Sequence, residues 1–148
     1  MRDNDSVKVV MGFLESQKDG VAKTMEYLAE DITWCAQRPR YSFSGGRLAD
    51  LLSMGPLRGK KEVQDFFQII NDEIEYQDGK VTDIIAEDDK VVVLTQGKFW
   101  VKSTGKGSDV SSAIVFTVRD GKISEVRAYD DTAAVQDALT PTPQTDGL

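Results

Sequence analysis

The chain of 148 residues contains no histidine and a single cysteine, Cys35. Without histidine it cannot form a Ser-His-Asp triad, a Cys-His pair or a histidine-ligated metal centre. One cysteine permits neither an internal disulfide nor a thiolate zinc cluster, and no calcium-loop spacing of acidic residues is present. Any acid–base chemistry therefore falls to Asp, Glu, Tyr, Lys or water, and we expect no metal and no cofactor.

Positive charge is also scarce, with 18 Lys and Arg residues against 25 Asp and Glu residues and a net charge of −7. A nucleic-acid partner requires a basic surface, and an anionic membrane repels an acidic protein. No apolar run is long enough to span a membrane, and the N-terminal MRDNDS has no signal-peptide pattern. We expect a cytoplasmic protein that contacts neither nucleic acid nor membrane.

The remaining composition, 40% apolar and 29% charged, predicts one globular domain over 1–148. We expect order from about 6 to 139 and a flexible tail over 140–148. Apolar spacing predicts helices over 7–14, capped by Ser6, over 21–28, capped by Asp19, and over 60–74. Strands are expected over 32–34, 81–86, 90–102, 110–119 and 122–131. The order of these elements predicts an α+β fold, with helices packed on one face of a curved, mostly antiparallel sheet.

Two adjacent carboxylates, Asp130 and Asp131, end the last predicted strand, which follows an Asp-Gly hairpin signal. Strict alternation along this strand places Asp131 on the same face as Tyr129 and Ile123. A carboxylate that faces an apolar wall is a better base near neutral pH, because desolvation disfavours its charged form. It could then remove a proton α to a carbonyl group. Alternatively, Asp131 caps the Ala-rich helix that follows, or Asp130 caps this helix and Asp131 faces the pocket.

The segment 38–58 combines Pro and Gly with many apolar residues, which argues against disorder. It is interpreted either as a flap over a cavity or as packing against the sheet. Tyr129, Tyr41, Trp34 or Gln96 could donate a hydrogen bond to an enolate oxygen. The full set of residues expected to line a site with Asp131 is Trp34, Tyr41, Phe67, Gln96, Phe99, Phe116 and Tyr129.

Four stretches, YLAEDITW, GPLRGKKEVQDFF, VVVLTQGKF and VFTVRDGKISEVRAYDDTAAV, resemble the SnoaL-like branch of the nuclear-transport-factor-2-like superfamily. The resemblance extends over roughly 7–139. It implies a cone-shaped sheet wrapped around helices, an apolar pocket inside, and frequent homodimers. The superfamily includes polyketide cyclases, ketosteroid isomerases and epoxide hydrolases, as well as proteins without a known reaction.

The resemblance also places Asp131 at the position of a base at the end of the last strand. Residues that the epoxide hydrolases keep polar correspond here to Trp34, Ala36, Gly97 and Phe99, and the ketosteroid isomerase base corresponds to Ala36. These departures leave a cofactor-independent cyclase or isomerase acting on an apolar carbonyl compound as the expected function. The alternatives are a non-catalytic small-molecule-binding protein and an epoxide hydrolase-like enzyme with an altered site. A homodimer would form through the outer face of the sheet, where Lys98, Trp100 and Lys102 are expected.

Overall fold

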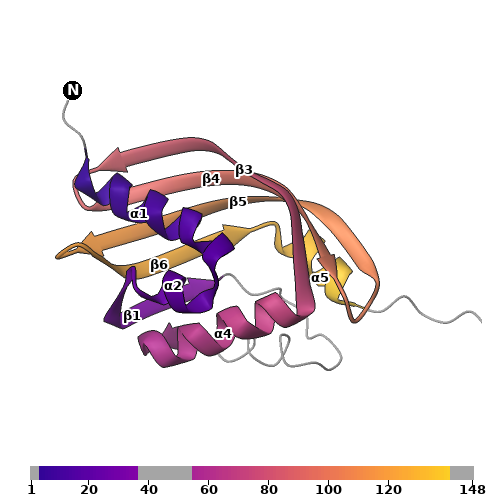
Figure 1. The fold of residues 1–148 in the computed structure, drawn as a ribbon. Coiled ribbons are helices and arrows are strands. Elements are labelled where there is room, and N and C mark those ends of the chain that lie inside the picture. The colour runs from indigo at the N-terminus through magenta and orange to yellow at the C-terminus, as the bar shows by residue number, and fades with distance from the viewer. Residues whose placement is uncertain (1–3, 37–54, 141–148) are drawn as a thin grey trace, which may run out of the picture.

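The computed structural model describes residues 4–36 and 55–140 (Figure 1). Most of the predicted flap, with Tyr41, and the predicted tail from 141 onward lie outside the described residues. None of the described helices is long and apolar enough to cross a membrane. The elements in order are α1 (Asp5–Ser16), η1 (Gln17–Asp19), α2 (Val21–Met25), β1 (Leu28–Ala36), β2 (Leu57–Arg58), α4 (Gly59–Glu73), β3 (Ile74–Glu87), β4 (Lys90–Val101), β5 (Lys106–Arg119), β6 (Lys122–Asp130) and α5 (Thr132–Leu139).

The predicted helices form, but the caps of the first two differ from the prediction, and α2 ends at Met25 rather than at residue 28. Asn4, not Ser6, caps α1, because the Asn4 Oδ1 accepts hydrogen bonds from the backbone N–H groups of Ser6 at 2.8 Å and Val7 at 3.3 Å. The α2 helix starts after Gly20 with no side-chain cap, so the expected cap at Asp19 is also wrong. The α4 helix lies within one residue of the predicted 60–74.

The described residues form a sheet of six strands in the order β2-β1-β6-β5-β4-β3, and every neighbouring pair is antiparallel except β1 with β6. Figure 1 shows it as a curved layer with α1, α2 and α4 on one side, which confirms the α+β prediction. We call the side that these helices cover the inner face, and the opposite side the outer face. Three strands begin earlier than expected: β1 at Leu28, β3 at Ile74 and β5 at Lys106.

Two apolar clusters fill the inner face. The first joins α1, α2 and α4 to the sheet, and its members include Val10, Phe13, Met25, Trp34, Val63, Val91, Val93, Phe116 and Val126. The second joins α4 and α5 to the other end of the sheet, through Ile74, Phe99, Val101 and Ala138. Phe66 of α4 packs against both clusters, so this helix spans the space between them.

The sheet bends sharply where the two clusters meet, and Figure 1 shows β3 turning on its path away from α4. Two register shifts interrupt the β3–β4 ladder, one between Gln77 and Lys80 and one between Val81 and Asp83. A Cβ atom on Gly97 would lie 3.0 Å from the Cα atom of Gly79, which is tighter than nearly all Cβ contacts and would require the β3 backbone to shift by a few tenths of an ångström. Gly97 therefore allows the β3 backbone to approach β4 at the bend.

Candidate functional site

Three polar residues separate the two apolar clusters on the inner face. Thr95 of β4 lies opposite Ser112 of β5, which in turn lies opposite Asp130 of β6. Residues directly opposite one another in antiparallel strands share a face. We call these three residues the polar row. It lies between Val93 of the first cluster and Phe99 of the second, so any molecule that contacts it also meets apolar surface.

Asp130 has one hydrogen-bond partner among the described residues. The Ser112 hydroxyl donates to its Oδ1 over 2.5 Å, at the short end of the range for O–H···O hydrogen bonds. Asp130 is half-buried. Its second oxygen, Oδ2, has no hydrogen bond within residues 4–36 and 55–140. The carboxylate is therefore fixed on one side and available as an acceptor on the other.

The inner-face carboxylate is Asp130 rather than the predicted Asp131 because β6 contains a bulge. Thr117 lies opposite Glu125 and Val118 opposite Ile123, so Ser124 is one extra residue in β6. An extra residue reverses the face of every side chain that follows it. Ile123 is consequently buried on the same side as Val126, Ala128 and Asp130.

Asp131 instead caps α5. The backbone N–H of Ala134 donates to the Asp131 Oδ1 at 3.1 Å, and the Asp131 side chain is exposed. The expectation that Asp131 faces the interior is therefore wrong, and the capping alternative is confirmed. This cap fixes the start of the helix directly after Asp130.

The sequence reading missed Tyr76, which lies on the inner face opposite Phe99. Although 63% of its surface is open, burial of the hydroxyl and, second, the charge of Asp130 raise the pKa of Tyr76 to about 12. So large an open fraction favours a smaller rise, but the phenol stays protonated at neutral pH in either case. Its hydroxyl makes no hydrogen bond to any other described residue. Tyr76 is therefore a free donor within the influence of the Asp130 charge.

The other residues predicted to line the site fall into three groups. Trp34, Phe67 and Phe116 are walls of the first cluster, where the Trp34 and Phe67 rings are 5.3 Å apart and Phe116 is fully buried. Phe99 is buried in the second cluster. Gln96 and Tyr129 lie on the outer face, because their neighbours Thr95 and Asp130 point inward. The expectation that these two residues line the site is therefore wrong.

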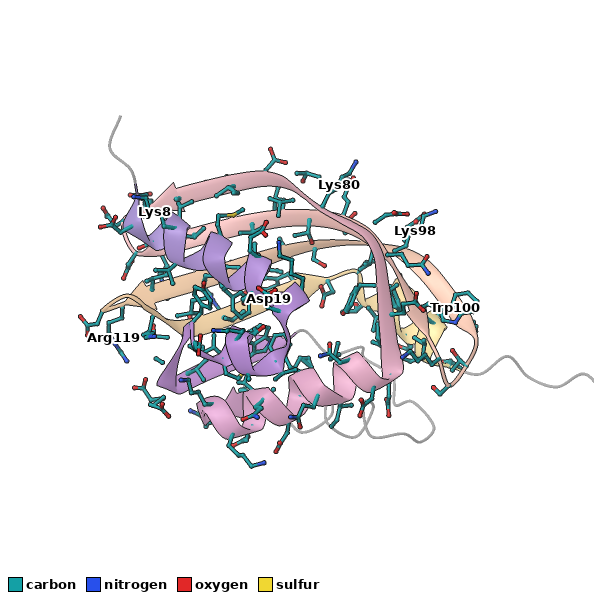
Figure 2. The ribbon with its side chains drawn as sticks, in the orientation of Figure 1. Lys8, Asp19, Lys80, Lys98, Trp100 and Arg119 are labelled. Carbon is teal, nitrogen blue, oxygen red and sulfur yellow. The ribbon has the colours of Figure 1, made fainter. Side chains whose placement is uncertain are left out.

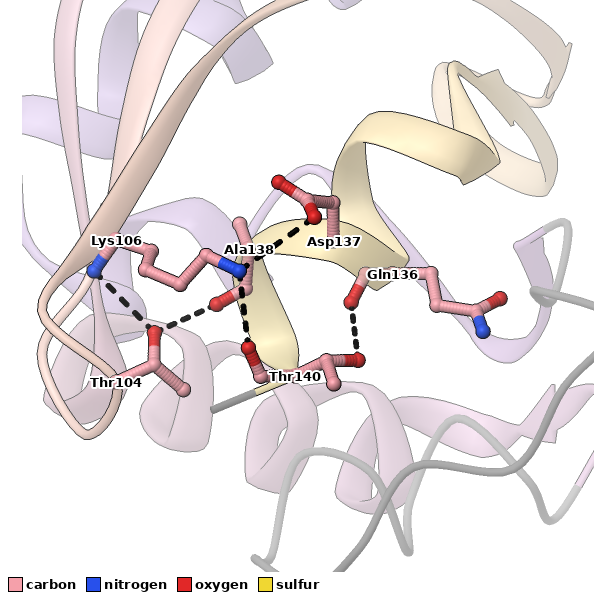
Figure 3. A network of polar contacts seen from close by, with 6 residues as sticks. All are labelled: Thr104, Lys106, Gln136, Asp137, Ala138 and Thr140. Carbon is pink, nitrogen blue, oxygen red and sulfur yellow. Dashed lines mark hydrogen bonds and ion pairs between the residues drawn. The ribbon is translucent and has the colours of Figure 1, made fainter. Parts of the chain in front are cut away.

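A polar network fastens the C-terminal end of α5 to the β4–β5 hairpin (Figure 3). The Thr104 hydroxyl donates to the carbonyl of Ala138 at 2.6 Å and accepts from the backbone N–H of Lys106 at 3.3 Å. The Lys106 Nζ lies 3.5 Å from an Asp137 carboxylate oxygen and 3.1 Å from the Thr140 carbonyl oxygen. Because Asp131 caps its other end, α5 is held at both ends beside the polar row.

The outer face carries two large aromatic side chains that are open to solvent: Trp100 is 44% exposed and Tyr129 is 41% exposed. Figure 2 shows Trp100, with Lys98 and Lys80, on the side of the sheet away from α1, α2 and α4. A Cβ atom on Gly107 would lie 2.7 Å from the Trp100 ring, so the indole lies across this glycine. Residues 4–36 and 55–140 contain no group of three His, Cys, Asp or Glu residues that could hold a metal ion.

Comparison with known proteins gives one family model, described as a SnoaL-like domain, that matches residues 14–126. Among solved structures, an NTF2-like protein from Burkholderia xenovorans LB400 is 24% identical, with a TM-score of 0.75 over 92% of this chain and 96% of that chain. TerC, co-crystallized with polyporic acid, is 15% identical, with a TM-score of 0.72 over 92% and 98%. An LEH-like epoxide hydrolase from M. tuberculosis is 18% identical, with a TM-score of 0.64 over 91% and 89%. These likenesses establish the fold, and a search of curated proteins finds no match.

Proposed function

Because the chain belongs to the SnoaL-like domain family, we propose that it binds a small apolar carbonyl compound on the inner face and acts on it as a cofactor-independent cyclase or isomerase. The observation that supports this proposal most strongly is the position of Asp130, an inward carboxylate between two apolar clusters. The co-crystal of TerC with polyporic acid adds support, because a protein of this fold takes up a small organic molecule.

In the proposed reaction, the Oδ2 atom of Asp130 accepts a proton from the carbon α to the carbonyl group. The electrons of the C–H bond form an enolate, whose negative charge lies mainly on oxygen. Ser112 holds the other carboxylate oxygen, which orients the base. If the α carbon is next to a C=C bond, return of the same proton from Asp130 to the far end of the conjugated enolate completes an isomerisation. Attack of the enolate carbon on a second carbonyl carbon instead closes a ring, and the alkoxide formed at that second carbonyl takes the proton back from Asp130.

An epoxide hydrolase-like reaction has less support. The resemblance places two polar residues of those enzymes at Gly97 and Phe99, and here Gly97 abuts the β3 backbone while Phe99 is buried in the second cluster. Neither residue can donate a proton to an epoxide oxygen.

Deuterium exchange into 2-tetralone, an apolar bicyclic ketone with acidic α protons, tests the proposed base. The protein should accelerate exchange in D₂O, followed by NMR, and Asp130→Asn should slow it by about a hundredfold or more. Asp131→Asn is the matched control, because it removes the neighbouring charge and keeps an oxygen that can cap α5. Exchange by Asp130→Asn at the wild-type rate would overturn the proposal. Binding of 2-tetralone without accelerated exchange would instead identify a non-catalytic binding protein.

We also propose a homodimer formed through the outer face, with Trp100 as its anchor. The support is the exposure of Trp100 and Tyr129 on a face that no described helix covers. Light scattering after size-exclusion chromatography should give twice the chain mass for the wild type and the chain mass for Trp100→Glu. A wild-type protein that elutes as a monomer would contradict this assembly.

A further inference from the structure

We propose that Tyr76 donates the hydrogen bond that binds the carbonyl oxygen of the ligand, so that the site selects compounds with an oxygen acceptor next to an acidic C–H group. The inference deepens the proposed function and rests on it for the ligand's place beside Asp130. In this arrangement a residue of β3 binds the carbonyl oxygen of the ligand, and a residue of β6 takes the proton from its α carbon.

The first support is the position of Tyr76. It lies opposite Phe99 on the inner face, and Phe99 lies four residues from Thr95 of the polar row. Between them, Gly97 allows the sheet to bend, and the bend turns the Tyr76 end of β3 relative to the strand ends that carry Asp130. Burial first, and the Asp130 charge second, raise the pKa of Tyr76, which agrees with the two side chains facing the same inner space.

The second support is that the hydroxyl is unused. The Tyr76 hydroxyl has no hydrogen-bond partner among the described residues, and 63% of the residue is exposed. A donor that is both accessible and unpaired can bind the oxygen of a ligand without first breaking a hydrogen bond within the protein.

The third support is electrostatic. The phenol is protonated at neutral pH, and burial and the Asp130 charge disfavour its ionisation further, since both raise the pKa of Tyr76. When Asp130 takes the α proton it becomes neutral, and the negative charge passes to the enolate oxygen. A protonated Tyr76 at that oxygen stabilises the charge where it develops, because its hydrogen bond strengthens as the oxygen becomes negative.

The test compares two ligands of the same shape, 2-tetralone and tetralin, which differ by the carbonyl oxygen. In equilibrium dialysis, Tyr76→Phe should weaken 2-tetralone binding about fivefold to tenfold, the value of one hydrogen bond, and leave tetralin binding unchanged. Tyr129→Phe is the matched control, because it removes a phenol from the outer face, and it should change neither. The ring retained in Tyr76→Phe preserves packing, which an unchanged urea midpoint verifies.

Three outcomes would overturn the inference. Tyr76→Phe could weaken the binding of 2-tetralone and of tetralin equally, it could weaken the binding of neither, or the wild-type protein could bind 2-tetralone no more tightly than tetralin. The base is tested separately. Asp130→Asn should retain the Tyr76-dependent preference for 2-tetralone while losing deuterium exchange. If Asp130→Asn exchanges normally, the proposed base fails while the Tyr76 result stands. If Asp130→Asn loses exchange but Tyr76→Phe keeps the wild-type preference for 2-tetralone over tetralin, the role of Tyr76 as donor is wrong and the role of Asp130 as base stands.

Discussion

Replacement of Asp131 by alanine separates the two roles that the sequence allows for this residue. In the structure its carboxylate accepts a hydrogen bond from the Ala134 N–H at 3.1 Å and is exposed. Loss of an N-cap of this kind costs about 0.5–2 kcal/mol of stability. Only eight residues form α5, and three of them, Val135, Ala138 and Leu139, pack in the second cluster. We therefore expect a loss in the upper half of this range, because a frayed first turn also loosens that packing.

Urea unfolding measures this loss as a lower midpoint, and a shift of about 0.5–1 M corresponds to it for a domain of this size. Asp131→Asn keeps an oxygen at the cap and should lose less than half as much. Deuterium exchange into 2-tetralone should persist in both variants wherever they are folded. The account of Asp131 as a cap is refuted if Asp131→Ala unfolds at the wild-type urea concentration and yet has lost exchange, since that pattern belongs to a base.

Three further predictions concern the bend, Tyr76 and the end of α5. Gly97→Ala places a Cβ atom 3.0 Å from the Gly79 Cα, so we expect urea unfolding to reveal a loss of about 1–3 kcal/mol, and an unchanged midpoint would mean that the bend relaxes freely. Because burial and the Asp130 charge raise the pKa of Tyr76 above 10.0, the folded state binds the proton more tightly than the unfolded chain, and stability should fall as pH rises above 10. Tyr76→Phe should abolish this fall in stability, and Asp130→Asn should make it smaller. If both variants have the wild-type dependence of stability on pH, the placement of Tyr76 near the Asp130 charge is wrong. Thr104→Val removes the hydroxyl that bridges the hairpin and α5, so amide exchange in the last turn of α5 should accelerate, and the role is wrong if protection is unaltered.

Elements with strong local signals were predictable from sequence. The hairpin at Asp120 and Gly121 has φ angles of 52° and 76°, the positive pair that an Asp-Gly turn between two strands favours. The α4 helix formed where its apolar residues repeat with helical spacing. In both cases neighbouring residues alone determine the backbone conformation, so tertiary context was not needed.

The site was less predictable, because the facing of its carboxylates depends on a single extra residue. Ser124 bulges out of β6, and no local signal distinguishes it from an ordinary strand residue. Alternation extended from Ile123 therefore selects Asp131, whereas alternation interrupted at Ser124 selects Asp130. The pairing of β6 with β5 determines which of the two adjacent aspartates faces inward, and the linear sequence does not reveal this pairing.

Tyr76 was missed for a related reason. Asp78-Gly79 has the composition of a turn, and it predicted that β3 begins only at Val81. In the structure Asp78 has a φ of 52°, but the chain continues as one bent strand from Ile74 because β4 offers Gly97 at the bend. Had the strand been extended to Ile74, alternation would have placed Tyr76 on the same face as this buried residue.

The most direct test of the central claim, that Asp130 rather than Asp131 is the base, is the ratio of 2-tetralone deuterium-exchange rates in Asp130→Asn and Asp131→Asn. Both rates are measured at equal concentrations of protein that NMR shows to be folded. The account predicts exchange by Asp131→Asn within a few-fold of the wild-type rate, and by Asp130→Asn slower by about a hundredfold or more. The reverse order, with exchange lost in Asp131→Asn and retained in Asp130→Asn, would contradict it.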